Sequence, residues 1–156
     1  MHKLYVLFVI GLLWTGADGR LLKDGQQVTK ISTLQEQEII ETVFHYQMQH
    51  CYQNVSRKVY FLTDRKVDPR DPLMERFRPY GNLVRKRSEL GEFLHEKSDE
   101  LPVLLSIRRI EPESDVTINV FGSCGTGPFE GASYLYRVVR RSGSWRITKQ
   151  KLRGVQ

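Results

Sequence analysis

Apolar residues recur at helical spacing between residues 33 and 52. One face of this segment collects them at steps of three and four, namely Ile40, Phe44, Met48 and Cys51. Just before the stripe, Ser32 or Thr33 is followed three residues later by Gln35 or Glu36, which is the spacing of a capping box. The pattern predicts one long amphipathic helix that ends near residues 52–54.

The hydrophobic period changes to two from Leu101 onward, as is typical of half-buried strands. Alternating apolar residues mark four strands up to the C-terminus. The expected connections are a turn at 112–114, a glycine-rich segment at 123–131 and a tight turn at 142–144. We therefore predict an antiparallel meander whose apolar face covers the helix.

The segment between the helix and the meander predicts short elements. Residues 58–62 (KVYFL) are rich in β-formers and predict a short strand. Asp68-Pro69 and Asp71-Pro72 each place a capping acid before a proline, which favours a short helix or two turns. For residues 83–100 the sequence does not decide between a short strand, a brief helix and a surface loop. Helical elements followed by an antiparallel sheet predict an α+β domain.

The N-terminus predicts export. Lys3 precedes an uncharged run over 4–14, and a small polar stretch with Ala17 and Gly19 follows, which is typical of a cleaved signal peptide. The eleven residues of that run are fewer than the ~20 that a membrane-spanning helix needs. We expect a signal peptide over 1–19, a flexible lead-in over 20–31 and one domain over 32–156. The mature product is expected to be secreted or periplasmic, with no membrane contact after cleavage.

Two cysteines occur, Cys51 and Cys124. In an oxidising compartment such a pair either forms a disulfide or remains as two separate thiols, and spacing alone does not decide between these outcomes. No H-x-x-x-H or C-x-x-C spacing is present, so we expect no metal site and no cofactor.

The net charge is +6, and basic residues are dense between residues 137 and 153. Arg137 and Arg146 alternate with apolar neighbours on their strands, as expected of a half-buried hairpin with cations in water. A nucleic-acid interface would place stacking aromatics on the basic face itself. We therefore expect a basic surface and no nucleic-acid partner.

The hairpin also carries a resemblance. YRVVR, the turn SGS and WRITK resemble the last two strands of the nuclear transport factor 2-like superfamily, and the order of elements is similar. ETVFHYQMQH, KVYFL, DPRDPLMERF and RKRS resemble small exported bacterial members of that superfamily. The resemblance implies a cone, with the N-terminal helix packed in a curved antiparallel sheet. The cystatins share this helix-on-sheet shape, but QQVTK at 26–30 lacks the glycine of their inhibitory loop and precedes the helix.

The resemblance also implies a pocket between helix and sheet. We expect it to be lined by apolar side chains of both, namely Ile40, Phe44, Met48, Tyr134, Tyr136 and Trp145, with the alternative that these residues form only the core. No catalytic residue can be transferred from an enzyme of the superfamily. His45 and Asp64 are the weak acid–base candidates, with a surface or turn role as the alternative for each.

We predict an exported, non-enzymatic binding or interaction module that takes an apolar small molecule, although enzyme activity stays open. One alternative is a small lyase or isomerase that acts on an apolar substrate. Another is a self-associating structural subunit, since sheets in the resembled superfamily pair as homodimers. Fold alone does not choose among these functions.

Overall fold

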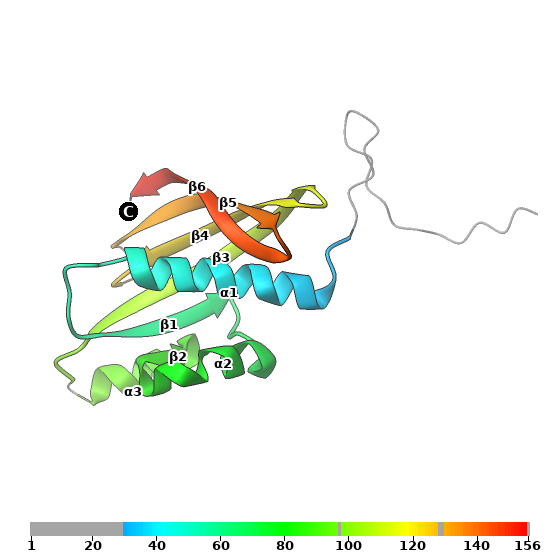
Figure 1. Cartoon of the computed structure of the whole chain (residues 1–156). Helices are drawn as coiled ribbons and strands as arrows, with labels where there is room; N and C mark the ends of the chain where they lie inside the picture. The colour runs from blue at the N-terminus through cyan, green and yellow to red at the C-terminus, as the bar shows by residue number, and fades with distance from the viewer. Residues whose placement is uncertain (1–29, 97, 128–129, 156) are drawn as a thin grey trace, which may run out of the picture.

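The computed structural model describes residues 30–96, 98–127 and 130–155 (Figure 1). The predicted signal peptide over 1–19 and nearly all of the lead-in over 20–31 lie outside the described residues. The described part has helices and one six-stranded sheet, so the predicted α+β class is confirmed.

Helix α1 (Thr33–His50) begins with a capping box. The Ser32 hydroxyl accepts a hydrogen bond from the Gln35 backbone, and the Gln35 side chain accepts one from the Ser32 backbone, which satisfies two amides of the first turn. The helix ends at His50, a few residues before the predicted end, because Cys51 already has an extended backbone.

The sheet has the order β2-β1-β3-β4-β5-β6. Strand β1 (Lys58–Asp64) pairs in parallel with β2 (Val84–Lys86) and with β3 (Leu101–Ser114). Strands β4 (Thr117–Gly125), β5 (Gly131–Arg141) and β6 (Ser144–Val155) continue from β3 as the predicted antiparallel meander.

The turn predicted at 112–114 is wrong, because β3 continues through Ser114 and the chain reverses at 115–116. Pro112 pairs with Ile118 of β4. On the side away from β4, the part of β3 that follows Ile107 has no neighbouring strand among the described residues, because the pairing with β1 ends at Asp64 and Ile107. Proline is tolerated at such edge positions of a sheet, where one side of the strand has no ladder to lose.

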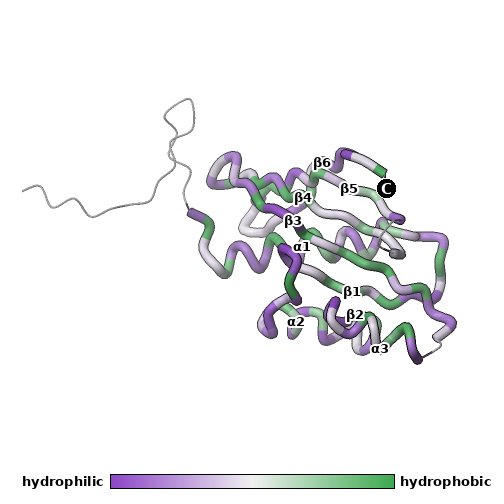
Figure 2. Tube along the Cα trace, turned by 180° about the vertical axis from the view of Figure 1, so that it is seen from behind, coloured by the Kyte–Doolittle hydropathy of each residue, from purple (hydrophilic) through white to green (hydrophobic). Residues whose placement is uncertain are grey.

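The main core lies between α1 and the inner face of the sheet, which is the face that α1 covers (Figure 1). Val43 and Phe44 are fully buried against sheet residues such as Leu105 and Val120. A smaller cluster on the other side of β1 joins Val59, Phe61, Leu90 and Phe93. Strand β1 is thus buried on both faces, in agreement with its hydrophobic colour in Figure 2.

The segments between β1 and β3 form short elements near the β1–β2 end of the sheet. They are α2 (Asp71–Phe77), the 3-10 turns η1 (Arg78–Leu83) and η2 (Arg87–Glu89), and α3 (Leu90–His95). The open prediction for 83–100 resolves into β2, η2 and α3. The predicted capping role of Asp71 is wrong, because Arg70 is the N-cap residue and Asp71 is already helical.

Candidate functional site

The six side chains predicted to line an apolar pocket lie in or against the core. Ile40, Phe44, Met48, Tyr136 and Trp145 have exposed fractions between 0% and 8%, and Tyr134 packs partly buried against them. They hold α1 on the sheet, which is the alternative that the sequence had left open, and Trp145 also lines the groove described next.

A groove of about 580 Å³ lies beside this core, between α1 and the β5–β6 hairpin. We call it the α1–hairpin groove. Its lining mixes acids, a histidine, aromatic rings and backbone: Glu38, Glu41, Thr42, His45, Tyr46, Gln49, Gly143, Ser144, Trp145, Arg146 and Ile147. The groove therefore suits a ligand with both polar and apolar parts.

The hairpin wall of the groove depends on a tight turn. Ser142 and Gly143 have φ values of 49° and 81°, as a two-residue hairpin turn requires. The turn brings Trp145 opposite Arg140, whose guanidinium lies 5.8 Å from the indole centroid. Among the described residues, the buried Trp145 Nε1 has no hydrogen-bond partner. Trp145 thus gives the groove an aromatic wall, and its buried indole N–H is a hydrogen-bond donor without an acceptor among the described residues.

His45 connects the groove to α2 and η1. Its Nδ1 lies 3.0 Å from the Tyr80 hydroxyl, and its Nε2 lies 3.7 Å from Glu41 Oε1. Both contacts are satisfied when Tyr80 donates to Nδ1 and the Nε2–H points at the carboxylate. The imidazole also stacks on Phe77, with centroids 5.0 Å apart. Both ring nitrogens are therefore engaged, which holds the ring in one orientation.

Glu41 is the centre of this polar chain. One carboxylate oxygen contacts His45, and the other accepts from Arg76 of α2. Sequence reasoning missed this role of Glu41, although its i,i+4 spacing to His45 was a readable signal. The contributions of Tyr80 and Arg76 had no local signal, because each lies 35 residues from its partner.

Asp64, the second acid–base candidate, lies in a different hollow. Its carboxylate accepts two hydrogen bonds from Arg65, at 2.9 and 3.0 Å, and Arg65 also pairs with Glu36. This hollow has a volume of about 340 Å³ and its lining does not include His45. The structure therefore does not bring His45 and Asp64 together, and Asp64 acts in an ion pair at the end of β1.

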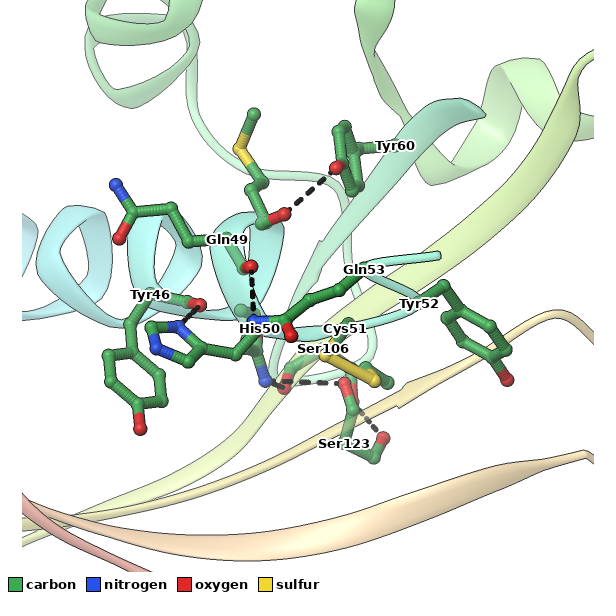
Figure 3. The surroundings of a disulfide bond; sticks show 12 residues. Tyr46, Gln49, His50, Cys51, Tyr52, Gln53, Tyr60, Ser106 and Ser123 are labelled. Atoms are coloured by element: carbon green, nitrogen blue, oxygen red, sulfur yellow. Dashed lines mark hydrogen bonds between the residues drawn. A yellow bond between two sulfur atoms is a disulfide. The ribbon is translucent and has the colours of Figure 1, made fainter. Parts of the chain in front are cut away.

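A disulfide joins Cys51 to Cys124 and attaches the end of α1 to β4 (Figure 3). The same region holds other contacts of the helix end. Tyr60 Oη donates to the Met48 carbonyl at 2.9 Å, and His50 Nδ1 lies 2.8 Å from the Tyr46 carbonyl. The C-terminal turn of α1 is thus held by covalent and polar contacts in addition to packing.

A buried polar cluster lies next to the disulfide. The Gln47 amide, fully buried, donates toward the Ser123 carbonyl and the Tyr136 hydroxyl, each at 3.3 Å. The Ser106 and Ser123 hydroxyls lie 2.6 Å apart (Figure 3). Burial raises the pKa of the Tyr136 phenol well above its usual value. Sequence reasoning missed Gln47, because a single glutamine on a helix gives no sign of burial.

Comparisons of the chain with family models, curated proteins and solved structures find no match. The resemblance to the nuclear transport factor 2-like superfamily therefore stays a prediction. Among the described residues, no group of three or more His, Cys, Asp or Glu side chains could hold a metal ion. In the same part of the chain, no helix has the length and hydrophobicity to cross a membrane.

Proposed function

We propose that the protein is an exported, non-enzymatic binding module whose ligand occupies the α1–hairpin groove. The observation that carries this proposal is the groove itself, since helix and hairpin together leave an open volume of about 580 Å³ beside a filled core. This location is between helix and sheet, as the resemblance implies, but its lining is partly polar. A small amphipathic molecule fits it better than a purely apolar one.

The lining suggests how such a molecule would bind. An apolar body would pack against Tyr46 of α1 and against Trp145 and Ile147 of β6. A polar or cationic group would face Glu38 and Glu41 on the helix. Tyr46 is already held in place, because its hydroxyl donates to Gln150 Oε1 at 3.0 Å. A preorganised wall of this kind lowers the entropic cost of binding.

The test is native mass spectrometry for a retained molecule, followed by a thermal-shift screen of amphipathic compounds. Gln49→Trp should block the groove at little cost in stability, because Gln49 is exposed at its rim. Gln53→Trp is the matched control outside the groove. We expect ligand-induced shifts in the wild type and the control, and their loss in Gln49→Trp. Equal shifts in all three proteins would place the ligand elsewhere.

His45 supports a second candidate, a small lyase or isomerase that acts in the same groove. With Nε2–H directed at Glu41, the lone pair of His45 is on Nδ1, and proton abstraction requires that a substrate displace the Tyr80 hydroxyl from it. Deuterium exchange into a panel of enolisable ketones, followed by NMR, tests this candidate. Exchange that His45→Gln abolishes and His50→Gln preserves would favour the enzyme. Absence of exchange across the panel would favour the binding module.

A further inference from the structure

The sheet has an outer face that α1 does not cover. The strand register places Arg109, Phe121, Leu135 and Lys151 in one row across β3, β4, β5 and β6 on this face. A second row holds Glu111, Asn119, Arg137 and Lys149. Helix α3 packs on this side against Val59 and Phe61 of β1, and Leu104 of β3 joins that cluster. Among the described residues, the outer face of β4–β6 is therefore open to solvent.

Basic side chains gather on this face along β6. Lys149 and Lys151 are two residues apart on one strand, so they point to the same side about 7 Å apart. Both are exposed, as is Arg153 beyond them, and none of the three has an ion-pair partner among the described residues. Strand β6 is also the edge of the sheet, which leaves this row accessible from the side.

The acids near this face are already paired. Glu111 contacts Arg109 at 2.8 Å, and Glu113 contacts Arg137 at 2.7 Å. Within each pair the two charges cancel. The excess positive charge of the face therefore rests on the β6 row and on Arg108, an exposed residue of β3. The positive electrostatic potential of such a surface attracts anionic partners.

Arg153, at one end of the basic row on β6, lines a hollow of about 440 Å³. The hollow is lined by Arg108, Arg109, Phe121, Gly122, Ser133, Tyr134 and Arg153. Three arginines from two strands thus line one concave volume. Arg108 and Arg153 supply its excess charge, because Arg109 is paired with Glu111, and the Arg109 guanidinium lies 4.2 Å from the Phe121 centroid. Stacking on the ring orders this guanidinium in advance. The hollow suits a sulfate or carboxylate group, to which arginine donates two parallel hydrogen bonds.

We propose that the outer face binds a linear polysaccharide that carries sulfate or carboxylate groups. One anionic group would occupy the arginine hollow, and the next along the polymer would contact Lys151 and Lys149. Single-stranded nucleic acid fits less well, because it binds by stacking bases on open aromatic rings. Phe121 is an aromatic ring of this face, and Arg109 already covers it. The predicted export would also bring the face into contact with extracellular polysaccharide.

The test measures elution from immobilised heparin over a sodium chloride gradient, together with solution affinity for a heparin fragment. The triple variant Lys149→Gln, Lys151→Gln, Arg153→Gln removes the row. Its matched control, Arg57→Gln, Arg70→Gln, Arg78→Gln, removes the same charge from exposed sites away from this face. We expect the row variant to bind at least about tenfold more weakly at moderate salt, since about three contacts are lost. The control should bind like the wild type.

Two further arms keep the inference falsifiable. Lys149→Arg, Lys151→Arg keeps the charge and should keep the affinity, and thermal midpoints of all variants report whether they fold. Equal weakening in the row variant and the control would overturn the proposal in favour of net charge alone. A single-stranded oligonucleotide that competes for the face at lower concentration than heparin would overturn the choice of partner. The α1–hairpin groove lies on the helix side of the sheet, so its ligand screen is independent of these results.

Discussion

The side-chain amide of Gln47 on α1 lies 3.3 Å from the hydroxyl oxygen of Tyr136 on β5, and both residues have an exposed fraction of 0%. The same amide nitrogen reaches the backbone carbonyls of Ser123 and, at 3.5 Å, Ser106. The amide oxygen has no partner among the described residues. One glutamine therefore joins the helix to the three strands β3, β4 and β5 through polar contacts inside an apolar core.

Gln47→Ala should destabilise the protein by about 2–4 kcal/mol. The substitution leaves a cavity and also removes the donor that the Tyr136 hydroxyl and two partly buried carbonyls share. Chemical denaturation at neutral pH measures the change. Gln49→Ala, on the exposed side of the same helix, is the control and should stay within about 0.5 kcal/mol of the wild type. A small effect at Gln47 would show that its hydrogen bonds only offset its own burial.

Stability should fall at alkaline pH because of Tyr136. Burial raises the pKa of its phenol in the folded state, with a smaller opposing effect from the Gln47 hydrogen bond. The folded protein thus holds this proton above about pH 10, where the unfolded chain has lost it. The stabilisation is complete below that pH and is lost as pH rises toward the folded-state pKa. Denaturation at several pH values from about 8 to about 11 measures the loss.

Tyr136→Phe should reduce this alkaline loss, because the titrating group is gone. At neutral pH it should cost about 1 kcal/mol, the usual contribution of one hydrogen bond. Burial also raises the pKa of Tyr60, so some alkaline loss should remain in the variant. An unchanged pH profile in Tyr136→Phe would assign the alkaline loss to other groups.

Removing the disulfide should cost about 4 kcal/mol in the chain-entropy description, because Cys51 and Cys124 are 73 residues apart. The double variant Cys51→Ala, Cys124→Ala and the reduced wild type should unfold at similarly lowered denaturant midpoints. Retention of the wild-type midpoint in the reduced protein would mean that packing alone holds the end of α1. Because Cys51 caps the helix, amide exchange should rise first in its last turn.

Gly122→Ala and Gly91→Ala form a matched pair with opposite expected signs. A methyl group at Gly122 would lie 2.6 Å from the Ser106 carbonyl oxygen and 2.9 Å from Gln47 Nε2. The first contact is with backbone, so the strand must shift and the variant should lose at least about 1–3 kcal/mol. Gly91 in α3 has open space, and alanine there should stabilise by about 0.5–1 kcal/mol. Thermal or chemical unfolding distinguishes the two.

The elements with a strong period could be predicted from the sequence, since local geometry alone sets that period. The apolar stripe through Phe44 predicted α1, and alternation around Tyr136 predicted the meander. Prediction failed where tertiary context overrides a local signal. Pro112 indicated a turn, yet it lies inside β3 because the strand has no neighbour on one side there. Asp71 indicated a cap, yet the helix starts one residue earlier.

The candidate site was predicted less well than the fold, because it depends on tertiary contacts between segments that are far apart in the sequence. His45 was singled out from the sequence. Its partner Glu41 is one turn away on the same helix, but Tyr80 and the groove formed with Trp145 follow from how η1 and the hairpin pack on α1. The residues expected to line a pocket are apolar and lie on the inner side of the helix and sheet. Because protein interiors are closely packed, such side chains fill the core and leave little open volume among them.

By itself, the sequence determined the class of the domain, the helix stripe, the alternation of the strands and the alternation of cations with apolar residues on the last hairpin. Only the tertiary structure decided that Cys51 meets Cys124, that Gln47 is buried, and that Lys149 and Lys151 share an open face with Phe121. Periodicity is a local property of helix and strand. Sheet order, register and bulges instead set which distant residues meet, and they depend on the whole chain at once.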